Sequence, residues 1–128
     1  MPLSAEGIEF VTARGLASLT TLRADGTPHV TAVGYTWDAE AGLVRVICSG
    51  TSQKARNARR TRRAAVCQVD GARWLTFEGA ALVSDDPARV AEAVARYAVR
   101  YRQPRVNPAR VVVEIAVDRV LGSPALRA

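Results

Sequence analysis

The sequence predicts a small, mainly β domain: a six-stranded antiparallel barrel with short helices. Short runs of apolar or alternating residues, each of strand length, recur along the 128 residues. Asp-Gly pairs separate some of these runs, as in tight hairpins. The helical segments between them are too few to cover both faces of an open sheet. Closing the sheet into a barrel removes its exposed edges, so we expect one such domain over residues 1–128.

The strand assignments follow from composition and turn signals. Asp25-Gly26 separates the first two runs, and Asp70-Gly71 separates the fourth and fifth. The last run is rich in valine and alternates in polarity, as a long strand would. The six expected strands are 16–22, 29–36, 43–48, 64–69, 73–83 and 110–121.

Three helices are expected between these strands. The first covers 4–14, with Ser4 as a possible cap and Gly7 inside it. The second lies in a basic segment after the third strand. The third starts at Asp86-Pro87, an acid at the cap followed by proline in the first turn, and ends before Pro104.

The basic segment, residues 49–63, reads SGTSQKARNARRTRR and contains no acidic residue. The chain has 18 Lys and Arg against 12 Asp and Glu, a net charge of +6, and this segment alone carries six cations. Such a focus of charge attracts a polyanion. Thr51 or Ser52 would cap the helix, whose first-turn N–H groups and Lys54 could hold a phosphate. A solvated basic face is the alternative. The cations are Lys54, Arg56, Arg59, Arg60, Arg62 and Arg63, of which Arg56, Arg60 and Arg63 are expected on one helix face.

Composition also limits the remaining chemistry. No apolar stretch is long enough to span a membrane and no N-terminal segment looks like a secretory signal, so we expect a cytoplasmic protein without a membrane partner. Cys48 and Cys67 lack metal-ligand spacing and are expected as buried free thiols, and no metal is expected. His29, the single histidine, is expected to be structural.

Four segments in order resemble a known family: LASLTTLRADGTPHVTAVGYTWD, ICSGTSQKARNARR, CQVDGARWLTFEG and RYAVRYRQPRVNPARVVVEI. They are similar to the pyridoxamine-phosphate-oxidase-like split barrels, and most closely to the actinobacterial branch that uses the deazaflavin coenzyme F420. The resemblance covers nearly the whole chain. It implies a six-stranded split β-barrel of the FMN-binding type that forms a homodimer and binds two cofactors in grooves at the subunit interface.

The resemblance also assigns site residues by position. Ser49, Ser52, Lys54 and Asn57 match the phosphate-binding segment, and Arg60 matches a basic residue at the cofactor tail. The strand from Val30 to Tyr35, with Val33, Gly34 and Tyr35 as the cofactor-binding residues, is expected beside the ring, where its backbone groups can read the pyrimidine edge. Gln68 and Trp74 match a strand pair near the cofactor, with Trp74 either contributed by the second subunit or packed as a strand aromatic. For Tyr101, Arg102 and Arg105, interface packing and ligand contact are both open.

The implied function is hydride transfer from reduced F420 to a conjugated acceptor, with biliverdin as the first expectation. Six cations suit the lactyl and γ-linked glutamate tail of F420 better than FMN, which carries one phosphate. The alternatives are an FMN-dependent enzyme, a non-catalytic deazaflavin carrier, and a nucleic-acid-binding module. The last is disfavoured because no aromatic residue interleaves with the basic run. A homodimer is also expected to cover an apolar outer face of the last strand, formed by Val111, Val113 and Ile115 or by the residues that alternate with them.

Overall fold

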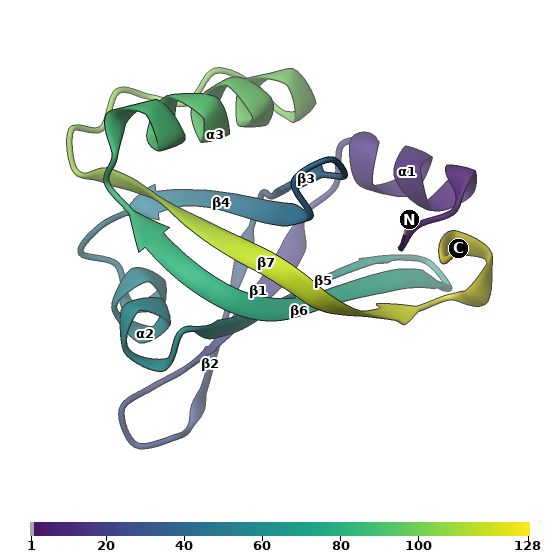
Figure 1. The fold of residues 1–128 in the computed structure, drawn as a ribbon, viewed down its shortest axis with the longest axis horizontal. Helices are drawn as coiled ribbons and strands as arrows, with labels where there is room; N and C mark the ends of the chain where they lie inside the picture. The colour runs from purple at the N-terminus through teal and green to yellow at the C-terminus, as the bar shows by residue number, and fades with distance from the viewer. Residues whose placement is uncertain (1) are drawn as a thin grey trace.

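The computed structural model describes residues 2–128 and confirms the mainly β fold (Figure 1). Seven strands form one antiparallel sheet in the order β2-β1-β5-β6-β7-β4-β3. The elements are α1 (Ala5–Thr12), β1 (Ala17–Leu22), β2 (Pro28–Val33), β3 (Thr36–Asp38), β4 (Leu43–Ser49), α2 (Gln53–Thr61), β5 (Arg63–Asp70), β6 (Arg73–Ser84), α3 (Pro87–Arg100), β7 (Arg110–Gly122) and the 3₁₀ helix η1 (Pro124–Leu126).

The sheet curls until its two edges are joined by a very short connection. β2 and β3 stand at opposite ends of the strand order, yet only Gly34 and Tyr35 separate them in the chain. The three residue steps from Val33 to Thr36 span at most about 11 Å, so the two edges approach each other at this connection and leave a split between them. This is the split barrel that the sequence predicts, with a seventh, short strand.

The continuous strand expected over 29–36 is wrong, and the reason lies in α3. A Cβ on Gly34 would stand 2.9 Å from Cε2 of Tyr97 and 3.0 Å from Cε2 of Tyr101, so only glycine fits there without displacing a ring. The N–H of Tyr35 donates to the Tyr101 hydroxyl (3.1 Å) instead of to a strand. The chain therefore leaves the β1 pairing at Val33 and resumes pairing with β4 at Thr36.

The first half of β7, residues 111–115, is buried on both faces, which contradicts the bare apolar face expected there. Val111, Val113 and Ile115 are at most 4% exposed, and Val112 between them is fully buried. The reason is that α3 packs across β4 and β7 and covers the face that the barrel core does not (Figure 1). No apolar surface is left along residues 111–115 to require a partner.

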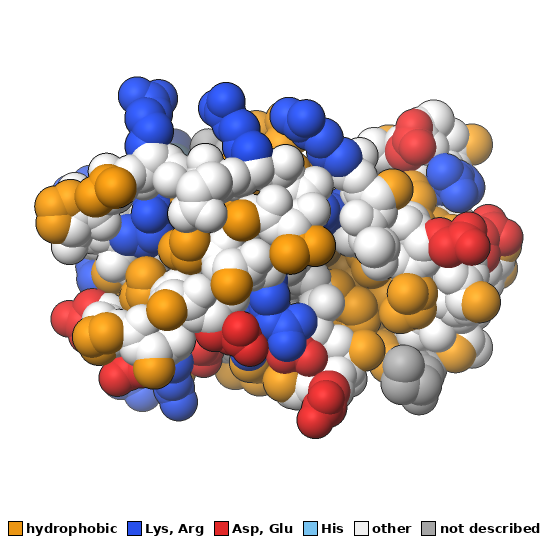
Figure 2. Space-filling model, turned by 90° about the horizontal axis from the view of Figure 1, so that it is seen from above, with side chains coloured by type: hydrophobic (Ala, Val, Ile, Leu, Met, Phe, Trp, Pro, Cys, Tyr) orange, Lys and Arg blue, Asp and Glu red, His pale blue; other side chains and the backbone are white. Residues whose placement is uncertain are grey.

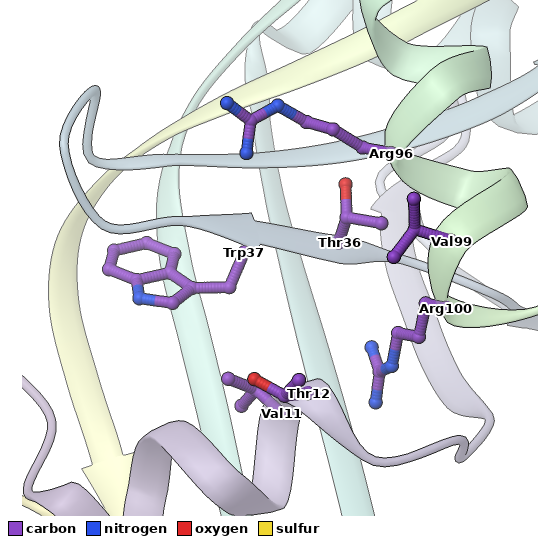
Figure 3. A pocket seen from close by; sticks show the side chains of 7 residues that line it. All are labelled: Val11, Thr12, Thr36, Trp37, Arg96, Val99 and Arg100. Carbon is purple, nitrogen blue, oxygen red and sulfur yellow. The ribbon is translucent and has the colours of Figure 1, made fainter.

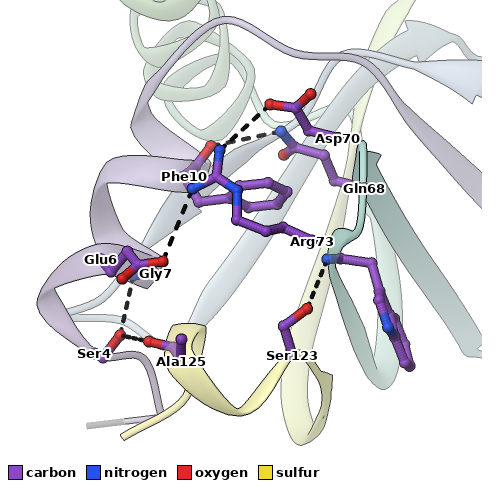
Figure 4. A network of polar contacts seen from close by, with 10 residues as sticks. Ser4, Glu6, Gly7, Phe10, Gln68, Asp70, Arg73, Ser123 and Ala125 are labelled. Atoms are coloured by element: carbon purple, nitrogen blue, oxygen red, sulfur yellow. Dashed lines mark hydrogen bonds and ion pairs between the residues drawn. The ribbon is translucent and has the colours of Figure 1, made fainter.

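α1 closes one end of the barrel together with η1, a turn that the sequence did not predict. Ser4 caps α1, accepting from Gly7 N (3.1 Å), and its hydroxyl donates to the carbonyl of Ala125 (2.6 Å; Figure 4). A Cβ on Gly7 would lie 2.1 Å from the carbonyl oxygen of Leu126, so glycine is required inside this helix. Leu126 is fully buried, and the chain end thereby becomes part of the core.

Both cysteines are free, as expected, but they are half-buried rather than buried. Burial raises the pKa of the Cys48 thiol, against the opposing effect of the Ser52 hydrogen bond and of nearby Lys54 and Arg59. Cys48 is therefore a neutral thiol at physiological pH. Within residues 2–128, no helix has both the length and the apolar character needed to cross a membrane.

Candidate functional site

The amino end of α2 combines a side-chain cap, backbone N–H groups without a helical partner and a first turn without acidic residues. Ser52 caps the helix: its hydroxyl accepts from Ala55 N (3.4 Å) and donates to the carbonyl of Ser49 (2.7 Å). The first bond of the helical ladder runs from Arg56 N to Ser52 O (3.1 Å), which leaves the N–H groups of Gln53 and Lys54 outside that ladder. The first turn contains no acidic residue. Free donors and the positive end of the helix dipole therefore point the same way.

The cations of this segment remain uncompensated, with one exception. Arg59 donates to the carbonyl of Gly50 (2.7 Å), and Arg60 donates to the carbonyl of Leu22, so both use neutral acceptors. Arg63 is the exception. Among residues 2–128, Arg63 is the only cation of the basic segment that takes part in an ion pair.

Arg63 does not belong to the basic helix face, where the sequence placed it. Arg62 adopts a left-handed conformation (φ 58°) and ends the helix, and Arg63 starts β5. Its guanidinium contacts both carboxylate oxygens of Asp118 on β7, at 2.6 and 3.2 Å. The hydrogen bond from Arg63 holds the pKa of the Asp118 carboxyl below its usual value. Within the basic segment, the positive charge without an acidic partner is thus confined to residues 54–62.

Asn57 lies inside the molecule rather than on the anion-binding face. It is fully buried, its Oδ1 accepts from Gln53 Nε2 (2.7 Å), and its Nδ2 donates to Thr21 Oγ1 on β1 (3.1 Å). The bond to Thr21 holds α2 against β1, and the bond from Gln53 fixes the Asn57 side chain within the helix. Asn57 is therefore placed to position the helix, one step away from any bound phosphate.

A second polar cluster fixes the Gly34–Tyr35 connection, and its centre is Arg100. The guanidinium donates to the carbonyls of Tyr35 (2.5 Å) and Ala13 (3.0 Å) and to Gln68 Oε1 (3.0 Å). The Tyr35 hydroxyl donates to the same Gln68 oxygen (2.6 Å). Burial raises the pKa of Tyr35, so this hydroxyl is a neutral donor at all physiological pH values. No sequence motif identifies Arg100 as a site residue. The spacing of residues along a helix does not show that this arginine turns inward at the end of α3.

The cluster also limits what Tyr35 and Gln68 can offer a ligand. The N–H and C=O of Tyr35 are already bound by Tyr101 and Arg100, so they are not free to read a ring edge. Gln68 is 4% exposed and faces the cluster. β2, by contrast, is an edge strand, and its outward backbone groups up to Gly34 have no strand partner. The backbone N–H and C=O groups that have no strand partner at the split thus belong to β2 and Gly34.

Trp74 lies far from α2 within one chain. It stands opposite Val69 near the β5–β6 turn and is 40% exposed, whereas Arg63, where β5 follows α2, stands opposite Ala80. Six residues of strand separate the two positions, about 20 Å at 3.3 Å per residue. A single chain therefore does not bring Trp74 to the basic segment.

Groups suited to acid–base or metal chemistry are sparse. Among residues 2–128, no three His, Cys, Asp or Glu side chains gather closely enough to hold a metal ion. His29 lies on β2 with a buried Nδ1 that has no partner. On the side that carries α3, some basic side chains project along one margin, and others lie beside acidic side chains (Figure 2). The arrangement can bind and orient an anionic molecule but offers no catalytic triad.

Comparison with known proteins shows which family the chain matches and finds a relative in which more than half of the aligned residues are identical. Residues 3–123 match the model of the family Pyridoxamine 5'-phosphate oxidase. A protein named F420H(2)-dependent biliverdin reductase, from Mycobacterium tuberculosis (strain CDC 1551 / Oshkosh), is 55% identical over 121 residues, which are 94% of this chain and 88% of that protein.

Solved structures share the same fold. A conserved hypothetical protein from Mycobacterium tuberculosis has a TM-score of 0.79 at 28% identity and covers 93% of this chain and 83% of its own. A structure named F420 reductase has a TM-score of 0.73 at 24% identity, over 88% of this chain and 94% of its own. At that identity the second likeness shows the fold alone.

Proposed function

The chain belongs to the pyridoxamine 5'-phosphate oxidase family, and on that basis we propose that it is an F420H2-dependent oxidoreductase that reduces biliverdin or a similarly conjugated acceptor. The 55% identity to the biliverdin reductase, over 88% of that protein, carries the proposal. The uncompensated cations of α2 support it independently, because they suit a cofactor with several negative charges.

The residues of α2 fit the anionic part of F420. Ser52 caps a helix start with unbonded N–H groups, and Lys54 adds a half-buried ammonium, so a phosphodiester would be held there. Arg59, Arg60 and Arg62 follow on exposed positions and would face the glutamate tail. Ser49 supports the cap through its carbonyl, and Asn57 holds the helix in place.

The edge of β2 and Gly34 would lie beside the deazaflavin ring. When bound, reduced F420 supplies a hydride, so the protein needs to bind, orient and exclude water rather than supply a nucleophile. Gly34 presents bare backbone at the split. Arg100 and Gln68 keep that backbone in one conformation through Tyr35.

A homodimer completes this proposal, with its interface on the outer face of β2, β1 and β5. No helix of residues 2–128 covers that face, and Val30 and Val69 on it are 61% and 64% exposed. They flank a shallow hollow of about 340 Å³ that also includes Leu16 and Cys67. Trp74 stands opposite Val69 in the strand register, so it would lie at the margin of the same interface. We place the dimer in the cytoplasm, where free thiols persist.

Anaerobic turnover tests the proposed function. Reduced F420 is mixed with the protein and a panel of acceptors that includes biliverdin, and the reappearance of oxidised F420 absorbance is followed. We expect oxidation that depends on biliverdin and does not occur when reduced FMN replaces F420. Tight F420 binding without turnover of any acceptor would instead indicate a carrier, and turnover with FMN alone would refute the cofactor assignment.

A further inference from the structure

The loop after α3, residues 101–109, encloses a hollow that contains none of the α2 residues. After α3 the chain runs back alongside the helix to the start of β7 (Figure 1). The hollow between helix and loop has a volume of about 720 Å³, a size that suits a small-molecule ligand. Tyr97 of α3 forms one wall. Three arginines also line the hollow, Arg102, Arg105 and Arg110, and no acidic residue does.

The arginines of this loop are available to a ligand, unlike those that α3 turns toward α1 and β3. Figure 3 shows Arg96 and Arg100 on that other side of the helix. There Arg96 pairs with Asp38 (3.1 Å), and the guanidinium of Arg100 donates to three oxygen atoms of the fold. Arg102 and Arg105, by contrast, are exposed and take part in no ion pair among residues 2–128.

The neighbouring sequence supplies no acid to neutralise this charge. Glu92 and Glu114 are the nearest acidic residues along the chain, and they already pair with Arg96 and Arg89, at 3.5 and 3.6 Å. Arg110 donates to a carbonyl of the loop (2.6 Å), which is a neutral acceptor. Because a guanidinium can only donate, the hollow fits a ligand that brings acceptors with negative charge, and carboxylates are the natural match.

The backbone of the loop is held in place by hydrogen bonds and prolines. The N–H of Gly50 donates to the carbonyl of Ala109 (2.8 Å), and the N–H of Ala109 donates to Asn107 Oδ1 (3.0 Å). Pro104 and Pro108 restrict the backbone further, since each ring fixes its φ angle. A loop ordered in this way loses less entropy when a ligand binds.

The hollow adjoins the place proposed for the deazaflavin ring. Its Tyr97 wall packs on Gly34, where an added Cβ would lie 2.9 Å from the Tyr97 ring. At the other end, Arg110 stands opposite Ser49, whose carbonyl accepts from the α2 cap Ser52 (2.7 Å). A molecule in the hollow would therefore lie beside the ring, at the side of the groove that α3 covers.

We propose that this hollow is the acceptor subsite, in which Arg102 and Arg105 bind the carboxylate side chains of a planar conjugated acceptor that lies against Tyr97. The proposal rests on the proposed function, which supplies the hydride donor beside the hollow. It narrows the acceptor to conjugated molecules with two carboxylates, a class that includes biliverdin. Conjugated acceptors without carboxylates should be reduced poorly, because they leave these arginines unpaired.

A pair of acceptors and a set of matched variants test the subsite. Biliverdin and its dimethyl ester share one conjugated system and differ only in the two carboxylates. With reduced F420, kcat/KM should be about 10-fold higher for biliverdin than for the ester. Arg102→Gln/Arg105→Gln should remove that preference by lowering kcat/KM for biliverdin alone, mainly through KM, and Arg102→Lys/Arg105→Lys should keep most of it. Arg119→Gln/Arg127→Gln, which removes two exposed charges outside the hollow, should behave as the wild type.

Binding measurements separate this proposal from the proposed function. Biliverdin is titrated into protein loaded with oxidised F420, and its visible circular dichroism is followed. We expect Arg102→Gln/Arg105→Gln to weaken biliverdin about 10-fold while F420 affinity stays within 2-fold of the wild type. This pattern without turnover of any acceptor would support the subsite and refute the reductase. Equal binding of biliverdin and its ester, unchanged biliverdin affinity in the Gln variant, or an equal loss of F420 affinity would overturn the subsite.

Discussion

The two polar regions of this protein use arginine in opposite ways. At the end of α2, Arg59 and Arg62 are exposed and have no acidic partner among residues 2–128. At the Gly34–Tyr35 connection, Arg100 is half-buried, donates three hydrogen bonds and lies over the Tyr35 ring at 4.5 Å. The first region has charge available for a ligand, and in the second the charge is already used by the fold.

This difference separates the residues that can bind a ligand from the residues that hold the backbone in place. Exposed cations contribute little to folding, so they can be removed with small effects on stability. Buried donors that hold a backbone turn cannot be removed with such small effects, because their loss leaves carbonyls and amides unbonded. Variants in the two regions should therefore fall into two classes, stability effects near α3 and affinity effects on α2.

The largest effect is expected from Arg100→Met. It removes donors to the carbonyls of Tyr35 and Ala13 and to Gln68, so the free energy of unfolding should fall by about 3 kcal/mol. Urea unfolding measures it. Arg102→Met, at an exposed position two residues on, is the control and should change stability by less than about 0.5 kcal/mol. A loss below about 1 kcal/mol for Arg100→Met would show that the connection holds without it.

Asp38→Asn should lower stability by about 2 kcal/mol at neutral pH, since a buried carboxylate serves Arg45 and Arg96. The hydrogen bond from Arg45 lowers the pKa of Asp38. Its stabilisation is therefore fully present above the unfolded pKa of about 3.9 and is lost as pH falls through the lower folded value.

The pH dependence of this pair gives the check. The stability difference between wild type and Asp38→Asn should be constant from about pH 7 to pH 5 and should shrink below about pH 4. Asp118→Asn, which disrupts the exposed pair with Arg63, is the matched control and should have little effect at any pH. A difference that persists undiminished at pH 2 would mean that packing, and not charge, is responsible.

Lys54→Ala should weaken F420 binding by about 1.5 kcal/mol while leaving the melting temperature unchanged, because it removes one charged hydrogen bond to the phosphate. Isothermal titration calorimetry measures the dissociation constant. Arg63→Ala serves as the control, since Arg63 is occupied by Asp118, and should bind F420 as the wild type does. Equal affinity of Lys54→Ala and wild type would move the phosphate elsewhere.

The smallest effect on F420 affinity is expected from the cations that would face its glutamate tail. Changing Arg59, Arg60 and Arg62 together to Gln should cost about 1 kcal/mol for F420 with a long glutamate tail, and almost nothing for the tail-free form. The difference should grow at low salt, because these charges are exposed. Gel shifts with the same triple variant test the competing reading: nanomolar oligonucleotide binding that the variant abolishes, with F420 affinity unchanged, would favour a nucleic-acid site.

The sequence by itself determined the features that depend on near neighbours in the chain. The helix start at Asp86-Pro87 and the Asp-Gly hairpins formed as predicted, and of the two caps that the sequence offered for α2, Thr51 and Ser52, the structure uses Ser52. Each of these features rests on hydrogen bonds and backbone preferences within a few residues. The cation-rich segment was equally plain from composition. These features determined the order of strands along the chain and located the basic helix α2.

Only the tertiary structure decided which of those residues remain available. Arg63 is taken by Asp118, 55 residues away, and Asn57 by Thr21, 36 residues away. The break at Gly34 depends on Tyr97 and Tyr101, and the burial of 111–115 depends on α3. Such pairings form between residues distant in the chain, where no spacing pattern records which side chains meet. The sequence therefore shows which groups could bind, and the fold selects those that are left free to do so.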